Sequence, residues 1–167
     1  ADQAASEILI ALCEAEREVV RARDGLLVPE PDELLADAFR TKIEALSNGS
    51  GKYLIAEIAG NAVANASLAP MGLRKLSQVL RLDMCVHLGP WHQGHGRALL
   101  GSLLHWAHTD STACKVELLV RAENLRAVAL YHTHGFAEEG RMRDRARLRD
   151  GRFIDDINMA LFLQRDV

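Results

Sequence analysis

Two glycines one residue apart, Gly94 and Gly96, lie where an alternating strand pattern gives way to a helical one. The first amides of a helix have no intrahelical partner and carry a partial positive charge, so such a junction can bind a phosphate group. Glycine also lets the backbone approach a ligand closely. We therefore predict a phosphate-binding loop built from backbone amides. The residues that supply these amides are Gln93, Gly94, His95, Gly96, Arg97 and Ala98.

The segment before this loop, 79–88, alternates strictly between apolar and polar side chains. The apolar set is Leu80, Leu82, Met84, Val86 and Leu88, and the polar set is Arg81, Asp83, Cys85 and His87. Because successive side chains of a strand point to opposite faces, one face is predicted to be core and the other to be polar or to line a cleft. The segment 115–121 alternates in the same way and has Glu117 on its polar face.

The remaining periodicities predict a mixed α and β fold. An amphipathic helix is expected over 4–23, with its polar face formed by Glu7, Glu14, Glu16 and Arg17. A second helix is expected over 33–46, capped by Asp32. Strands are expected over 52–58, 62–68, 138–149 and 152–163, the last pair joined at Asp150-Gly151, and a short helix follows Asn124. The fold class is α+β, with one mostly antiparallel twisted sheet of about six to seven strands and about four helices.

The length, net charge and cysteine content of the chain restrict the class of protein. The chain has 167 residues and a net charge of −3, which favours a single domain spanning 1–167 and argues against a nucleic-acid partner. No apolar run reaches the roughly 20 residues that a membrane span needs. The three cysteines are widely spaced and odd in number, which favours a reducing cytoplasm over a disulfide framework.

All seven histidines lie between His87 and His134, and several are closely spaced pairs. A metal site would need several of them to converge with a carboxylate or a thiolate. The pairs fall on separate predicted elements with no zinc-binding spacing, so no metal is expected.

Residues 80–163 resemble the GNAT superfamily of acetyl-CoA-dependent N-acetyltransferases. The segment from Gln93 to Ala98 resembles the second half of the family's pyrophosphate loop, although Trp91 stands where that loop usually opens with Gln or Arg. A second match is Ala122-Glu123-Asn124 followed by Ala129-Leu130-Tyr131 and Gly135-Phe136. A third is the hairpin around Asp150-Gly151, which is similar to the end of bacterial amine, amino-acid and polyamine acetyltransferases.

The resemblance implies acetyl-CoA as cofactor, a sheet that is splayed where it binds, and direct transfer in a ternary complex. It also divides the chain into a helical substrate lid (1–50), a sheet with the cofactor loop (52–121), and a second signature with the C-terminal hairpin (122–167). By the same analogy alone, a homodimer is expected.

The resemblance also implies residue roles. The backbone of Val86, His87 and Leu88 would pair with the pantetheine arm, and a backbone amide near Val86 would hold the oxyanion. Tyr131 would be the general acid that protonates the departing thiolate, or alternatively a core aromatic. Asn124 would hold the pantetheine arm or a water, or would simply cap the following helix.

An amine acceptor arrives protonated, so the reaction needs a route for its proton. Asp83 and Glu117 are the candidate bases, each acting through water, and His87 is a third; solvated carboxylates without a role are the alternative. The sequence does not decide which amine is the acceptor. The candidates are an amino acid, a polyamine, an amine toxin or antibiotic, and a protein N-terminus or lysine. A non-catalytic acyl-CoA sensor is the rival interpretation from another class. A dinucleotide-binding oxidoreductase is disfavoured because the third glycine of its motif is missing.

Five arginines alternate along the strand predicted over 138–149, and they are Arg141, Arg143, Arg145, Arg147 and Arg149. Residues two apart on a strand share a face, so these guanidinium groups are expected on one face. That face is either solvated, with Asp155 or Asp156 as partners, or an anion-binding wall for substrate or a dimer partner.

Overall fold

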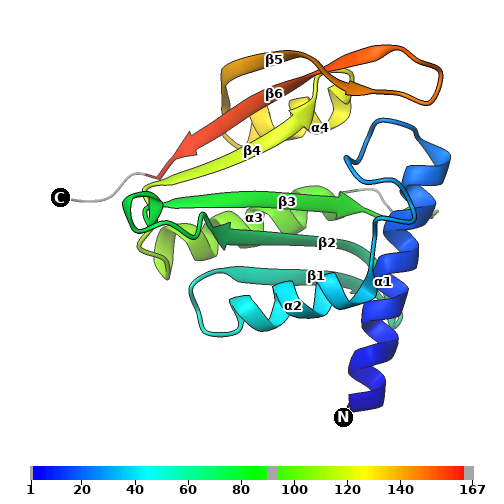
Figure 1. Ribbon diagram of the computed structural model, residues 1–167. Helices are drawn as coiled ribbons and strands as arrows, with labels where there is room; N and C mark the ends of the chain where they lie inside the picture. The colour runs from blue at the N-terminus through cyan, green and yellow to red at the C-terminus, as the bar shows by residue number, and fades with distance from the viewer. Residues whose placement is uncertain (1, 90–93, 164–167) are drawn as a thin grey trace.

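The computed structural model of the protein describes residues 2–89 and 94–163 (Figure 1). The elements in chain order are α1 (Asp2–Ala22), α2 (Ala36–Leu46), β1 (Lys52–Ile58), β2 (Asn61–Pro70), the 3₁₀ turn η1 (Arg74–Leu76), β3 (Val79–Val86), α3 (His95–Thr109), β4 (Lys115–Arg121), α4 (Leu125–Thr133), β5 (Ala137–Arg147) and β6 (Phe153–Phe162). The predicted α+β class is confirmed.

The six strands form one sheet in the order β1-β2-β3-β4-β6-β5, and every neighbouring pair is antiparallel except β3 and β4. The parallel pair is short, because Val79–Arg81 of β3 pairs with Lys115–Glu117 of β4 and the ladder ends there. Beyond Arg81 the two strands diverge, as Figure 1 shows. The expected splay therefore lies in the middle of the sheet, between β3 and β4.

The two faces of the sheet carry different helices. Ala64, Ala66 and Leu68 of β2 point into the main core, which they share with the buried leucines of α3. The residues between them, Asn65 and Ser67, therefore point to the opposite face. That face is covered by α1, because the Asn65 side chain is hydrogen-bonded to Glu16 of α1. A second apolar cluster holds α1 and α2 together, and it includes Leu12, Val20 and Phe39.

The start of α2 differs from the prediction. Asp32 is not the cap: α2 begins at Ala36, and the N-cap residue Leu35 makes no side-chain hydrogen bond. The Glu33 amide donates to the Glu30 carbonyl oxygen at 3.0 Å, and the Glu33 carboxylate accepts from the Glu30 amide at 2.8 Å. These bonds stabilise a turn, so the helix starts three residues later than its periodicity suggested.

The arginine row on β5 is also not as predicted. The pairing of β5 with β6 is irregular between Met142 and Ala146, and Asp144 has a φ of +51°. This irregularity breaks the alternation, so the five guanidinium groups do not share one regular face. Arg141 binds Asp155 at 2.7 Å, as one interpretation expected, whereas Arg149 lies beyond the strand and bonds to Glu30 at 3.1 Å.

None of the helices in the described part of the chain is both long and apolar enough to cross a membrane.

Candidate active site

A cavity of about 840 Å³ lies between the sheet and the segment that contains α1 and α2. The lining residues on the sheet side come from β2, from β3 and, past the divergence of the strands, from the end of β4. The start of α3 and one face of α4 line it as well. Opposite them lie parts of α1, of the loop 26–29 and of α2, so the 1–50 region predicted to cover a substrate contributes residues to this cavity.

The glycine loop opens onto this cavity. Gly94 is the N-cap of α3 and has a φ of +83°, a left-handed conformation that favours glycine. A Cβ atom on Gly96 would lie 3.1 Å from Val86 Cγ2, so the helix start packs directly against β3 only because a side chain is missing there. Gln93 and Trp91 lie outside the described residues.

The backbone amides at this helix start are not equivalent. The Ala98 amide donates to the Gly94 carbonyl oxygen at 3.1 Å and closes the first helical turn, so it is not available to a ligand. The amides of His95, Gly96 and Arg97 precede that bond, and helix geometry gives them no partner within the helix. The Nε2 atom of His95 is buried and has no hydrogen-bond partner in the described structure. Of the amides predicted to bind an anion, only that of Ala98 is thereby excluded, and those of His95, Gly96 and Arg97 stay candidates.

Beyond Arg81, the edge of β3 that faces β4 has no strand partner among the described residues, and the Val86 carbonyl oxygen has a contact of 3.9 Å with Cys85 Sγ. The His87 amide donates to the Val63 carbonyl oxygen of β2 at 2.9 Å. Since neighbouring residues of a strand direct their amides to opposite sides, the Val86 amide and carbonyl face the gap left by β4. His87 and Leu88 also line the cavity, although both follow the last residue of β3. The structure thus brings this predicted pantetheine-binding edge and the helix start together.

Asn124 and Tyr131 lie on the other side of the gap. Asn124 caps α4, since its Oδ1 accepts from the Ala127 amide at 3.2 Å, and it also lines the cavity. The capping alternative is therefore confirmed. Tyr131 is 7% exposed and belongs both to the main core and to the cavity wall. Burial, followed by the negative charge of Asp83, raises the pKa of Tyr131 to about 12, so the phenol keeps its proton at neutral pH.

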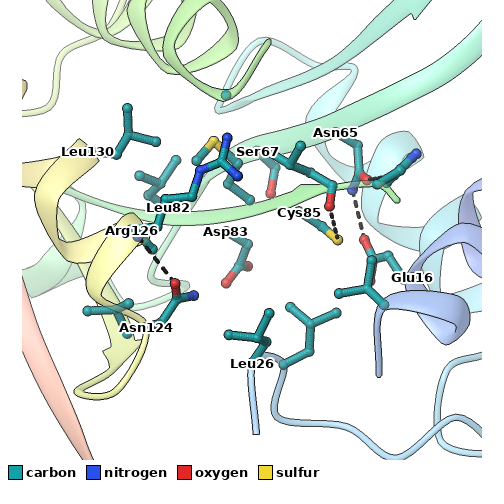
Figure 2. Close-up of a pocket in the computed structure, with 18 of the residues that line it drawn as sticks. Glu16, Leu26, Asn65, Ser67, Leu82, Asp83, Cys85, Asn124, Arg126 and Leu130 are labelled. Atoms are coloured by element: carbon teal, nitrogen blue, oxygen red, sulfur yellow. Dashed lines mark hydrogen bonds between the residues drawn. The ribbon is translucent and has the colours of Figure 1, made fainter. Parts of the chain in front are cut away.

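The two predicted carboxylates have separate environments. Asp83 projects from β3 into the cavity, between Asn124 and Glu16 in the view of Figure 2, and its Oδ2 accepts from Lys42 Nζ of α2 at 2.7 Å. Glu117 is not among the residues that line the cavity. Its carboxylate binds Lys115, which also binds Glu139 of the segment containing β5. The structure does not bring Glu117 together with Asp83.

Several polar residues that line the cavity were not predicted from the sequence, and three of them form one hydrogen-bonded group. Glu16 of α1, Tyr53 of β1 and Asn65 of β2 meet on the face of the sheet that α1 covers. The signal that could have found Asn65 is its alternation with alanine along β2. Glu16 was placed on the solvent side of its helix, because its neighbours Glu14 and Arg17 carry charge as well.

No group of three or more histidine, cysteine, aspartate and glutamate side chains suited to a metal ion occurs within residues 2–89 and 94–163.

An open strand pair beside a glycine-started helix, with a polar cavity next to it, is the arrangement that the resemblance to acetyl-CoA-dependent N-acetyltransferases predicted. The profile of the acetyltransferase (GNAT) family matches residues 17–136, and the chain belongs to this family. The protein is accordingly an N-acetyltransferase that uses acetyl-CoA as its acetyl donor.

The chain is 27% identical over 136 residues to an L-amino acid N-acetyltransferase, AaaT, of Escherichia coli K12, covering 81% of this chain and 80% of the relative. Its fold is similar to that of a GNAT acetyltransferase of Streptococcus pneumoniae, with a TM-score of 0.83, 21% identity and 95% of each chain covered. A Salmonella typhimurium acetyltransferase, solved with acetyl-CoA, has a TM-score of 0.84 at 20% identity and covers 97% of this chain and 92% of its own.

Proposed function

We propose that the protein transfers the acetyl group of acetyl-CoA to the primary amine of a small molecule, by direct attack of the amine in a ternary complex. The observation that carries this proposal is the single cavity into which the helix start at Gly96, the free edge at Val86 and the carboxylate of Asp83 all open. A phosphate-binding end, a strand edge for an extended amide chain and an anionic end for a cation thereby adjoin one another.

Acetyl-CoA supplies an activated thioester, and the chain's own groups would bind and orient it. The amides of His95, Gly96 and Arg97 are suited to its diphosphate, and the Val86 amide and carbonyl to its pantetheine arm. Tyr131 is the proposed proton donor to the sulfur. The proton of the amine goes to a carboxylate of the cavity, of which Asp83 is the one named from the sequence.

A phenol whose pKa is about 12 is a weak acid for a thiolate of ordinary pKa, near 8.5. Burial, however, also raises the pKa of a thiol in this cavity, since Cys85 on the same wall has its pKa raised, chiefly by desolvation. The pKa of the leaving coenzyme A thiol is raised by the same environment, which reduces the difference between its pKa and that of Tyr131. Tyr131 is therefore suited to protonating a thiolate inside the cavity and not in bulk water.

The proposed acceptor is a small amine with an apolar part, and L-amino acids are the first class to test. The segment opposite the sheet supplies apolar side chains to the cavity, among them Leu26, Val28 and Phe39. The relative from Escherichia coli is an L-amino acid N-acetyltransferase by name. Polyamines and amine toxins or antibiotics are the next classes.

The test is release of the coenzyme A thiol from acetyl-CoA in the presence of a panel of amines, run alongside calorimetry with acetyl-CoA alone. The proposal expects saturable binding of acetyl-CoA and thiol release with at least one small amine. Binding without release, while a peptide with a free N-terminus is acetylated, would contradict the small-molecule acceptor. A cytoplasmic location and a homodimer stay predictions of the sequence.

A further inference from the structure

Glu16 is a carboxylate of the cavity that forms no ion pair with any described residue. It lies on α1 and lines the cavity opposite β3. Its hydrogen bond is with Asn65, whose Nδ2 donates to Glu16 Oε1 at 2.9 Å. The nearby cation, Lys42, is bonded to Asp83 instead, and within the described residues no ion pair includes Glu16. A partly buried carboxylate without a counter-ion is poised to bind a cation from outside.

Asn65 is held in one orientation by the groups around it. It is 6% exposed, and its Nδ2 also donates to the hydroxyl oxygen of Tyr53 at 3.0 Å. On the other side, its Oδ1 lies 2.7 Å from His87 Nε2. Burial lowers the pKa of His87, so the ring is neutral and donates through one nitrogen. The Glu16 carboxylate can only accept, so Asn65 Nδ2 faces Glu16 and Asn65 Oδ1 faces His87, which requires the imidazole proton on Nε2.

The hydrogen bonds among these three residues therefore have one direction. His87 donates to Asn65, and Asn65 donates to Glu16. A proton on His87 Nε2 makes the carbonyl oxygen of the Asn65 amide the acceptor end. The amide nitrogen must then face Glu16 and Tyr53. Asn65 with the opposite orientation would set a carbonyl oxygen against the Glu16 carboxylate. His87 is 4% exposed and lies at the cavity wall, and its ring reaches Glu16 only through Asn65.

We propose that Glu16 binds the ammonium group of the acceptor and takes up its proton, that Asn65 holds Glu16 in place, and that His87 is the positioning residue that orients Asn65. This inference rests on the proposed acetyl transfer to an amine. It also gives Asp83 a smaller part, because Lys42 already neutralises that carboxylate. The acceptor is therefore a cation at its reacting end, with an apolar part toward the loop 26–29.

The proton balance is complete with groups already named. An acceptor R–NH₃⁺ gives one proton to Glu16 and becomes R–NH₂, whose lone pair forms the C–N bond with the acetyl carbon. The C–S bond breaks, and the second proton of the nitrogen reaches the sulfur by way of Tyr131. Glu16 then releases its proton to solvent. The products are the N-acetyl amine, the thiol of coenzyme A and one proton.

The titratable groups that face Glu16 come from four elements. They are Cys13 on its own helix, Lys42 on α2, Tyr53 on β1, and Asp83 and Cys85 on β3. The pKa values of both thiols and of the phenol are raised, chiefly by burial, so these three groups keep their protons near neutral pH, and Lys42 and Asp83 form an ion pair. Desolvation dominates at Glu16 and raises its pKa, which suits a group that must hold a proton during turnover.

The first test is the Glu16→Gln variant, which keeps the size of the side chain and its contact with Asn65. With the best acceptor of the amine panel, we expect kcat/KM to fall by at least about 100-fold, with unchanged affinity for acetyl-CoA. In the wild type, kcat/KM falls as pH drops through the Glu16 pKa; the variant loses that limb of the pH profile. Glu44→Gln, at an exposed glutamate of α2, removes the same charge and should behave as the wild type.

The second test separates positioning from structure. His87→Ala leaves Asn65 free to turn, which weakens the hydrogen bond that lowers the Glu16 pKa, so the acid limb moves to higher pH. His87→Gln can still donate to Asn65 Oδ1 and should return the limb toward its original position. Wild-type kinetics in Glu16→Gln, or a retained acid limb, would overturn the inference while leaving acetyl transfer intact. A wild type that binds no acetyl-CoA would overturn both proposals.

Discussion

Lys42 of α2 donates to Asp83 of β3 across 2.7 Å, and this ion pair ties the helical segment over the cavity to the strand on its floor. Both side chains are partly exposed, and an ion pair of this kind contributes about 0–1 kcal/mol to stability. Lys42 also acts on a second carboxylate of the cavity, because its positive charge lowers the pKa of Glu16. Lys42 therefore balances one of two neighbouring carboxylates.

Replacing Lys42 with methionine should move the pH profile while leaving the fold intact. Removing a positive charge disfavours ionised carboxylates, so the pKa of Glu16 should rise further and the acid limb of kcat/KM should move to higher pH. The measurement is the pH dependence of thiol release, with thermal unfolding in parallel. Lys75→Met, at an exposed lysine of η1, is the matched control. An acid limb that stays in place in Lys42→Met would contradict this reasoning.

Gly96→Ala tests the close contact between the start of α3 and β3. The added Cβ would lie 3.1 Å from Val86 Cγ2 and 3.6 Å from Leu130 Cδ2, so Val86 must shift. Overpacking of this kind costs about 1–3 kcal/mol, partly offset by the better helix propensity of alanine. We expect a net loss of about 1 kcal/mol in urea unfolding and roughly tenfold weaker acetyl-CoA binding by calorimetry.

Gly101 provides the matched control for that substitution. It lies in the same helix, and a Cβ atom there would have no neighbour within 4 Å. Gly101→Ala should therefore stabilise the protein by about 0.5–1 kcal/mol and leave acetyl-CoA binding unchanged. If Gly96→Ala and Gly101→Ala bound acetyl-CoA equally well, the helix start would have no part in the cofactor site.

Tyr131→Phe removes a hydroxyl from the cavity wall and keeps the ring that packs against Phe136, whose centroid lies 5.7 Å away. A general acid contributes about 10²–10⁴-fold to a rate, so kcat should fall by at least about 100-fold. The calorimetric affinity for acetyl-CoA should not change, because the phenol is not among the groups proposed to hold the diphosphate. Unchanged kcat would assign Tyr131 to the core alone.

Elements whose structure depends on local sequence patterns could be predicted, and two of those that line the cavity are examples. The alternation gave β3 its two faces correctly as far as Val86, because a strand's side-chain period depends only on neighbours in the sequence. The prediction was wrong for Leu88, which follows the end of the strand and is 42% exposed instead of lying in the core. The cap at Asn124 followed from the same kind of local rule. These two segments line the cavity from the two sides of the gap between β3 and β4, and local patterns alone identified both.

Glu16 and Asn65 were missed because their roles depend on tertiary contacts. A charged residue of an amphipathic helix is expected on the solvent-exposed face. Glu16 faces the cavity only because α1 packs across β2. The prediction that the five arginines share one face was wrong for a related reason. The irregular pairing around Asp144 in β5 cannot be predicted from the alternation of residues alone. Long-range contacts, and not local propensities, therefore determine the acceptor end of the site.

His87 should make the protein less stable in mild acid. Burial lowers its pKa in the folded state below the unfolded value, which is near 6.5. As pH falls through 6.5, the unfolded chain binds a proton that the native ring does not, so the free energy of unfolding decreases. Above pH 7.5 neither state holds that proton and the effect is absent.

The measurement is urea unfolding of the wild type and of His87→Gln at pH 7.5 and pH 5.5. Between these values the wild type should lose up to about 1.4 kcal/mol more than the variant. Glu16, whose folded-state pKa is raised, shifts stability in the opposite direction in both proteins, so the difference isolates His87. His105→Gln, at an exposed histidine of α3, should follow the wild-type curve. Equal losses in the wild type and in His87→Gln would mean that the native ring at His87 accepts a proton as readily as the unfolded chain does. The neutral imidazole that orients Asn65 would then be excluded.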